Sequence, residues 1–188
     1  MLQDYLTASV WRCRICGDSY LGSECPTNCP FCGSRKPYLV QTNDFSPHIN
    51  DVSLTDQERA DLRHACKLEI TNETFYSTVG AMGKHNDALP SAFRALAKVE
   101  REHLSLFGKL LQESVPTVPK NPLPVSDNWI ENINQSHKDE AIAASFYREA
   151  AARASSSRIK DVFTALAEVE EDHIDIDAFL KKIAHDQE

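Results

Sequence analysis

The chain has 188 residues, of which 41% are hydrophobic, so it can bury the core of one ordinary domain and leave room for a smaller unit. Its 28 acidic and 20 basic residues give a formal net charge of -8, and no basic cluster is interleaved with aromatic residues, which argues against a nucleic-acid-binding surface. No apolar run reaches transmembrane length, and the N-terminus lacks the basic start and apolar core of a signal peptide. We therefore expect a cytoplasmic protein without a membrane segment.

The first feature in chain order is a pair of Cys-x-x-Cys motifs separated by twelve residues. In a reducing compartment, such paired spacings indicate a metal site rather than disulfide bonds. Each motif is a tight turn that aims two thiolates at one point, and Gly17 and Gly33 follow where a side chain would crowd the backbone. The predicted metal ligands are Cys13, Cys16, Cys29 and Cys32.

The metal of this four-cysteine site is open between two possibilities. A segment this short cannot bury enough apolar surface to fold unaided, so the metal must supply folding energy. Zinc would make the site a structural staple, whereas iron would let it carry one electron, and tetrahedral sulfur ligation suits both metals. Two cysteines fall outside the pattern: we interpret Cys25 as a bystander in the loop and Cys66 as a thiol of the core.

A change of composition separates the four-cysteine unit from the rest of the chain. Residues 37–40 have the character of a short closing strand, and residues 41–53 are rich in Asn, Asp and Ser, as linkers are. The predicted domains are a four-cysteine metal domain at 1–40, the linker at 41–53 and a helical domain at 54–188. Capping signals and periodicity predict four helices in the last domain, at about 55–83, 87–112, 126–153 and 157–183.

Four prolines, at positions 116, 119, 122 and 124, prevent a helix between the second and third predicted helices. As an extended segment, residues 114–126 span roughly 40 Å, about the length of a 25-residue helix. The loop can therefore start the third helix at the end of the bundle where the second helix began. We predict a mainly α protein, in which the four-cysteine unit precedes a ferritin-like four-helix bundle with this long crossover.

The sequence Phe-x-Ala-Leu-Ala-x-Val-Glu-x-x-His occurs twice, at 93–103 and 163–173, with seven of eleven positions identical. On a helix, Glu-x-x-His places a carboxylate and an imidazole on one face, as a pair of metal ligands. Upstream of each copy, a glutamate precedes a tyrosine by seven residues, close to two helical turns, so the two side chains share a face. These upstream pairs are Glu69 with Tyr76 and Glu140 with Tyr147.

Each half of the helical domain thus supplies one lone glutamate and one Glu-x-x-His, aimed at a common centre. A single Glu-x-x-His often marks only a solvated helix face, but two copies in register, each with a matching upstream glutamate, are hard to attribute to chance. Four carboxylates neutralise two divalent cations, and with two imidazoles they suit a pair of iron or manganese ions. The predicted ligands are Glu69, Glu100, His103, Glu140, Glu170 and His173.

Three further residues are candidates beside this centre. Tyr76 and Tyr147 face the same way as the ligand glutamates, and we predict that each donates a hydrogen bond to a carboxylate, although plain core positions would show the same pattern. Glu73 follows Glu69 by four residues. It is either a seventh ligand or a carboxylate beside the ligands or facing solvent, because Asn72 and Glu73 compete for the inward direction.

With both motifs in place, the chain resembles the rubrerythrin family, with a rubredoxin-like four-cysteine unit at 11–40 and a ferritin-like di-iron bundle at about 54–185. The rubredoxin-like unit comes first, as in the reverse rubrerythrins. The resemblance implies a non-haem di-iron peroxidase that reduces hydrogen peroxide to water, with electrons that arrive from a reductase or a rubredoxin through an Fe(Cys)4 centre. It also implies a homodimer in which one subunit's rubredoxin-like domain lies beside the other's di-iron site.

The resemblance also suggests a role for each ligand and one departure. Peroxidase-type members carry a further glutamate about one turn after the third-helix ligand, where this chain has Ala143 and Ala144. Oxidation of ferrous iron or scavenging of dioxygen, with zinc in the four-cysteine site, is therefore a second candidate function, and a zinc-ribbon adaptor is a third. The resemblance implies that the bridging carboxylates are Glu100 and Glu170, and that the terminal ligands are Glu69 with His103 and Glu140 with His173.

Overall fold

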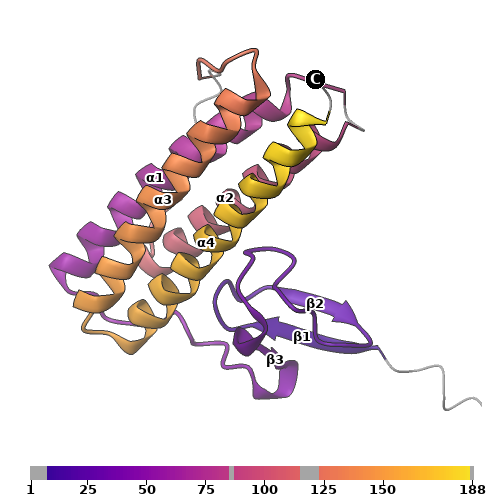
Figure 1. Cartoon of the computed structure of the whole chain (residues 1–188). Helices are drawn as coiled ribbons and strands as arrows, with labels where there is room; N and C mark the ends of the chain where they lie inside the picture. Colours follow the sequence, from indigo (N-terminus) through magenta and orange to yellow (C-terminus); the bar gives the residue numbers. More distant parts are fainter. Residues whose placement is uncertain (1–7, 85–86, 115–122, 187–188) are drawn as a thin grey trace, which may run out of the picture.

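The computed structural model of the chain describes residues 8–84, 87–114 and 123–186, which form a small three-stranded sheet and a four-helix bundle (Figure 1). Strands β1 (Ser9–Cys13), β2 (Ser19–Gly22) and β3 (Leu39–Gln41) are antiparallel, in the order β2-β1-β3. The last of these is the short closing strand that the sequence predicts. It pairs with the end of β1, where Cys13 lies opposite Leu39, and so holds the first cysteine turn in place.

Four helices make up the bundle, as the sequence predicts, and they are α1 (Asp56–Gly80), α2 (Ala88–Leu111), α3 (Trp129–Arg153) and α4 (Ser157–His185). A capping box opens α1: the Thr55 hydroxyl accepts a bond from the Glu58 N–H, and the Glu58 carboxylate accepts one from the Thr55 N–H. The end of α1, at Gly80, comes three residues earlier than predicted. Beyond it the backbone bonds tighten, because the Ala81 N–H donates to the carbonyl of Thr78, three residues back.

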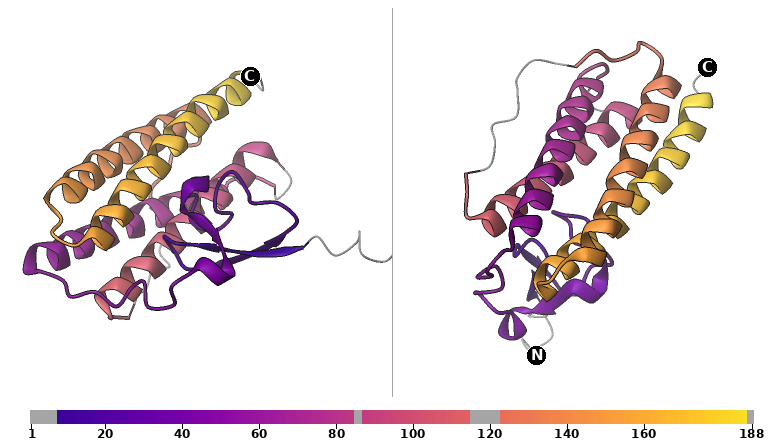
Figure 2. Two further views of the ribbon diagram at one scale, coloured as in Figure 1. Left: turned by 90° about the horizontal axis from the view of Figure 1, so that it is seen from below. Right: turned by 90° about the vertical axis from the view of Figure 1, so that its left-hand side faces the viewer.

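The third helix starts beside the start of the second, as the predicted crossover requires. Trp129 at the first position of α3 stacks on Phe93 of α2, with ring centroids 6.3 Å apart, and the Asn132 amide of α3 donates to the sulfur of Met82, just after α1. The right-hand view of Figure 2 shows α3 beginning at the end of the bundle where α1 ends. The connection is therefore ferritin-like. Residues 115–122 lie outside the described residues, so the extended proline segment stays a prediction.

Buried apolar side chains form two clusters, which a polar layer separates along the bundle. One cluster includes Phe107 and Phe163 and is continuous with the side chains of the four-cysteine unit. The other fills the opposite end of the bundle and includes Phe93 and Ile133. Between them, all four helices contribute buried charged side chains. Among the described residues, no helix combines the length and the apolar character needed to cross a membrane.

The four-cysteine unit packs against α2 and α4 of its own chain, as the left-hand view of Figure 2 shows. The Arg158 guanidinium of α4 donates to the carbonyls of Arg14 and Ile15, each at 2.6 Å. Further along α4, Asp172 forms an ion pair with Arg35 at 2.7 Å. These contacts fix the two cysteine turns beside the stretch of α4 that carries the second Glu-x-x-His.

Candidate metal centre

The four cysteines of the two motifs converge on one point. Their sulfur atoms lie within 4.8 Å of one another, with 3.7 Å between Cys13 and Cys32 and 3.8 Å between Cys16 and Cys29, and all four side chains are buried. The N–H of Ile15 donates to the Cys13 sulfur at 3.3 Å, a contact that favours the thiolate form. This donor set fits a metal ion in tetrahedral thiolate ligation.

Gly17 and Gly33, which follow the two motifs, have φ angles of +88° and +74°, in the left-handed region that favours glycine. Close packing gives Gly33 a second reason to lack a side chain. A β carbon at Gly33 would lie 2.8 Å from a methyl group of Val169 in α4. Because Val169 immediately precedes Glu170, this close approach brings the second cysteine turn against a ligand-bearing stretch of the bundle.

The six side chains predicted as bundle ligands meet in the polar layer. They form two groups of four, each with its possible ligand atoms within 4.8 Å of one another, and both groups contain Glu100 and Glu170. None of the six residues is more than 4% exposed. One group is completed by Glu69 and His103, and the other by Glu140 and His173.

The two groups repeat one geometry about a pseudo-two-fold axis. Nδ1 of His103 lies 3.2 Å from a Glu69 oxygen, and Nδ1 of His173 lies 3.1 Å from a Glu140 oxygen. Each Nδ1 atom is also within 3.4 Å of an oxygen of both shared glutamates. The two imidazole rings stack with centroids 6.5 Å apart. All six side chains therefore surround one compact site.

This layer carries more negative charge than its own side chains can balance. Five carboxylate oxygens, on Glu69, Glu100 and Glu170, have no hydrogen-bond donor among the described residues. Burial, reinforced by repulsion from Glu100, holds the pKa of Glu69 well above its ordinary value. Burial alone would lower the pKa of His103, but Glu69 and the shared glutamates outweigh it and raise that pKa. Two divalent cations would balance the four carboxylates, so the donor set fits a pair of metal ions.

Each tyrosine beside the centre donates a hydrogen bond to a ligand carboxylate of the opposite half. The Tyr76 hydroxyl of α1 lies 2.5 Å from Oε1 of Glu140 in α3, and the Tyr147 hydroxyl of α3 donates to Oε1 of Glu69 in α1. The helix face shared with a ligand glutamate correctly predicts that each tyrosine points inward. The carboxylate that each tyrosine contacts, however, belongs to the other helix of the pair α1 and α3. The cross-pairing orients both terminal glutamates toward the centre.

Glu73 belongs to neither ligand group in the part of the chain that the structure describes. Its carboxylate forms an ion pair with Arg101 of α2 and accepts a bond from the Ser77 hydroxyl at 2.9 Å. The inward direction is taken by Asn72, whose amide donates to Oε2 of Glu140 at 3.5 Å. Of the roles predicted for Glu73, the structure therefore favours a buried carboxylate beside the ligands over a seventh ligand.

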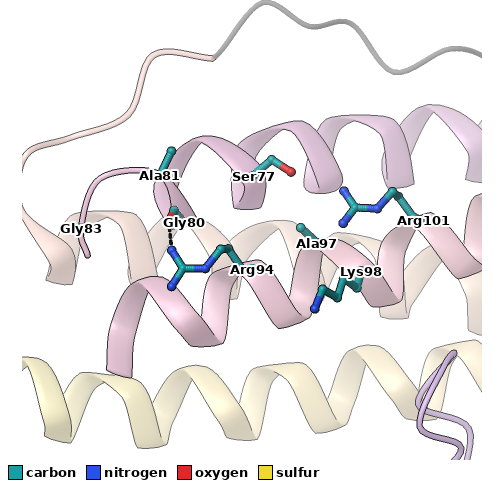
Figure 3. Close-up of a pocket in the computed structure, with 8 residues that line it drawn as sticks. All are labelled: Ser77, Gly80, Ala81, Gly83, Arg94, Ala97, Lys98 and Arg101. Atoms are coloured by element: carbon teal, nitrogen blue, oxygen red, sulfur yellow. Dashed lines mark hydrogen bonds between the residues drawn. The ribbon is translucent and has the colours of Figure 1, made fainter. Parts of the chain in front are cut away.

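Arg101 also lines a hollow of about 400 Å³ between α1 and α2, together with Arg94 and Lys98 (Figure 3). Arg94 donates to the carbonyl of Gly80, the bond drawn as a dashed line, and Arg101 extends toward α1. These cationic side chains lie outside the ligand groups. Through its ion pair, Arg101 offsets the charge of Glu73 and holds that carboxylate away from the centre.

A second hollow, a groove of about 600 Å³ between α2, α4 and the four-cysteine unit, reaches one ligand of the centre. Its walls are mainly apolar and include Leu96, Val99 and Ile176, and His173 also lines it. The groove therefore brings solvent-accessible space to the side of the centre where His173 lies.

Two contacts near the centre involve groups that the sequence motifs do not single out. Nε2 of His103 lies 3.0 Å from the carbonyl oxygen of Cys32, and the Ser136 hydroxyl contacts both Tyr76 and Asp177. A backbone carbonyl has no signature in a sequence. Ser136 and Asp177 are each four residues from a predicted ligand, and this helical spacing was the available signal.

Comparison with known proteins agrees with this geometry. Residues 61–181, which include all six bundle ligands, match the rubrerythrin family. Reverse rubrerythrin-1 of Clostridium acetobutylicum is 27% identical to the chain over 122 residues, which cover 60% of this chain and 67% of that protein. No solved structure matches the chain. With its four-cysteine unit ahead of its bundle, the chain belongs to the rubrerythrin family.

Proposed function

We propose that the protein is a peroxidase of oxidative-stress defence, which reduces hydrogen peroxide at the bundle centre with electrons relayed through the four-cysteine site. Membership of the rubrerythrin family and the similarity to a reverse rubrerythrin support the general class of di-iron protein. The reaction is H2O2 + 2 electrons + 2 protons → 2 H2O. The chain must therefore admit a small neutral oxidant, connect an electron source to the centre and deliver protons.

The contact between Cys32 and His103 is the observation that carries this proposal. Nδ1 of His103 faces the ligand carboxylates, while Nε2 lies 3.0 Å from the carbonyl oxygen of Cys32. A hydrogen bond to that carbonyl places the imidazole proton on Nε2 and leaves Nδ1 as a ligand atom. The path between the two sites then consists of the Cys32 backbone, one hydrogen bond and one imidazole ring, which suits electron transfer.

The bound metals would divide the work between the two sites. Two iron ions in the bundle would supply the two electrons that cleave the oxygen–oxygen bond, and iron in the four-cysteine site would restore those electrons one at a time. Zinc has no redox chemistry, so the relay requires iron at the cysteines. The groove beside His173 is the proposed entry for the oxidant, since its apolar walls suit a small uncharged molecule.

A second candidate function is oxidation of ferrous iron or scavenging of dioxygen, with zinc at the cysteines as a folding staple. One observation favours it. Ala143 and Ala144 occupy the turn after Glu140 where peroxidase-type members carry another glutamate, and they are only 1% and 2% exposed. That turn of α3 therefore brings no further carboxylate to the centre.

The two functions are separated by an experiment on protein purified from its native host. The protein is reduced without oxygen, stoichiometric hydrogen peroxide is added, and the visible band of the ferric tetrathiolate is followed. We expect the band to return quickly in the wild type and to be lost in His103→Ala, because that substitution removes both the ligand and the link to Cys32. Glu102→Ala, on the same helix but outside both ligand groups, is the matched control.

The opposite result would be equally informative. If peroxide oxidises the bundle while the tetrathiolate band stays absent, or if the native metal at the four cysteines is zinc, the electron relay is wrong. The ferroxidase or oxygen-scavenging function would then be favoured.

The proposed electron donor is a cytoplasmic reductase or a rubredoxin, and a homodimer remains our prediction. The four-cysteine unit contacts the centre of its own chain, so the proposed relay does not require a second subunit. Mixing a Cys32→Ser variant with a Glu100→Ala variant tests this point. If the relay is confined to one chain, the mixture should show no recovery of peroxide-driven electron transfer, whereas recovery would place the relay between subunits.

A further inference from the structure

A buried row of hydrogen-bonding side chains leads from the bundle centre to Asp177. The Tyr76 hydroxyl lies 2.5 Å from Oε1 of Glu140, the Ser136 hydroxyl lies 3.2 Å from that of Tyr76, and Oδ1 of Asp177 lies 3.0 Å from the Ser136 hydroxyl. All four residues are 0% exposed. They come from α1, α3 and α4, so the row crosses the interior of the bundle rather than following one helix.

When Glu140 is ionised, only a protonated Asp177 gives each of the three contacts in this row a hydrogen bond. A phenol and an aliphatic hydroxyl each carry one proton and so donate one bond each. If Tyr76 donates to Glu140 and Ser136 donates to Tyr76, then Ser136 can only accept from Asp177. That bond requires a proton on Oδ1 of Asp177. While Glu140 is ionised, an ionised Asp177 would leave two protons for three oxygen–oxygen contacts, and one buried contact would lack a hydrogen bond.

The surroundings of Asp177 favour the same protonated form. Burial raises the pKa of Asp177 to about 7, although a bond that the ionised form would accept from Ser136 and the positive charges of His173 and Lys181 oppose the increase. Its other oxygen, Oδ2, has no hydrogen-bond partner among the described residues. A neutral carboxyl group leaves that oxygen buried at a much lower cost than a carboxylate would.

Among the residues that the structure describes, the other half of the bundle has no equivalent row. There Tyr147 donates to Glu69, but the residue four positions before that glutamate is Ala65. The residue four positions after the first-half histidine is Phe107, whose ring lies 6.2 Å from the Tyr147 ring. The hydrogen bonds that lead away from Glu69 therefore stop at Tyr147. A row like that behind Tyr76 is not needed to hold a terminal glutamate in place.

We infer that Asp177 is a proton donor to the metal centre, acting through Ser136 and Tyr76. This inference rests on the proposed function, because peroxide reduction consumes two protons. In the transfer, the Asp177 proton moves to the Ser136 oxygen, the Ser136 proton moves to the Tyr76 oxygen, and the Tyr76 proton moves to Oε1 of Glu140. One proton leaves Asp177, one arrives at Glu140, and no electron moves. All three contacts remain hydrogen bonds with their directions reversed, and Asp177 must gain another proton before the row can deliver a second one.

The rate of oxidation of the reduced, iron-loaded protein by hydrogen peroxide tests the transfer. In the wild type, this rate should fall as pH rises through about 7, where Asp177 loses its proton. Asp177→Asn and Ser136→Ala should each lower the rate at pH values below 7 by at least about tenfold and remove this pH dependence. Asp161→Asn, an exposed aspartate of α4, is the control and should keep both the rate and its pH dependence.

Infrared spectroscopy of the same iron-loaded proteins gives a readout that does not depend on turnover, because a protonated carboxyl group has its own carbonyl stretch. The wild type should show this band at low pH and lose it near pH 7, and Asp177→Asn should lack it. Ser136→Ala should keep the band at a shifted frequency, because Asp177 loses its partner.

The inference is overturned if the Asp177 band is absent at low pH, or if both variants keep the wild-type rate and pH dependence. If the proposed function is wrong, the wild type itself does not react with hydrogen peroxide. The rate measurement is then repeated with dioxygen as the oxidant, and the infrared band still tests whether Asp177 is protonated.

Discussion

The two halves of the bundle present matching ligands to the centre and differ immediately behind them. In each half a lone glutamate, a Glu-x-x-His and a cross-bonded tyrosine repeat with similar geometry. Behind Tyr147 the packing is apolar, whereas behind Tyr76 it is polar and titratable. The residues concerned are Ala65 and Phe107 in one half and Ser136 and Asp177 in the other.

This difference shows that the ligands and the packing behind them are constrained separately. Two like ions require like donors, so the duplicated ligand pattern is preserved in both halves. The next layer only has to fill space and satisfy its polar groups, which an aromatic ring or a protonated acid with a hydroxyl partner can both do. The half behind Tyr147 can therefore be packed with apolar side chains, while the half behind Tyr76 contains a titratable acid.

The largest expected effect comes from removing a glutamate that belongs to the ligand groups of both halves. Glu100 belongs to both ligand groups, and both of its oxygens lack a hydrogen-bond partner among the described residues. Replacing Glu100 with Ala should abolish metal binding in the bundle while the four-cysteine site keeps its metal, as measured by metal analysis after anaerobic reconstitution. Glu102→Ala should retain the full metal content. Normal bundle loading in Glu100→Ala would contradict the shared-ligand assignment.

The half with apolar packing behind Tyr147 should lose more stability than the other half when a packed side chain is removed. Phe107 is fully buried, and its ring contacts those of Tyr147 and Phe163. Phe107→Ala should lower the free energy of unfolding by about 3–5 kcal/mol, because the cavity left behind cannot fully collapse. Urea unfolding measures this loss. Phe179→Ala, at a position that is 61% exposed, should change the same free energy by less than about 0.5 kcal/mol.

The titratable half should make stability depend on pH. The pKa of Asp177 is about 7 in the folded protein against 3.8 for an ordinary aspartate, so the folded state holds a proton that the unfolded chain releases. This contribution is fully present below about pH 4 and is lost as pH rises through about 7, a span of roughly 4 kcal/mol. In urea unfolding at several pH values, Asp177→Asn should flatten the dependence. A variant with the wild-type slope would show that Asp177 is not the group responsible.

Much of the centre could be predicted from the sequence, because its chemistry is tied to local spacing. Tight Cys-x-x-Cys turns bring thiolates together wherever they occur, and Glu-x-x-His fixes a ligand pair on any helix. The direction of Glu73 was not predictable in this way. Helical geometry leaves Glu73 and Asn72 nearly equivalent, and the choice depends on an ion pair with Arg101 on a different helix.

Contacts between different helices, and between the two domains, likewise could not be predicted from residue spacing along the sequence. The helix face of Tyr76 could be predicted, but not that its partner would be Glu140, because the partner depends on how α1 and α3 pack. The bond between His103 and the Cys32 carbonyl depends on where the four-cysteine unit docks, which long-range contacts such as that of Arg158 determine. These interactions belong to the tertiary structure and leave no repeat in the sequence.

The smallest expected effect distinguishes the two tyrosines. Replacing Tyr76 or Tyr147 with Phe removes one hydroxyl donor from a buried carboxylate, so each variant should lose about 1–3 kcal/mol of unfolding free energy. Only Tyr76→Phe also interrupts the row to Asp177. It alone should therefore remove the pH dependence of oxidation by peroxide, measured by rapid mixing, while Tyr147→Phe keeps that dependence at whatever rate it shows. Equal loss in both variants would mean that the hydroxyls act through the glutamates they orient, and the difference between the halves would then concern packing rather than proton supply.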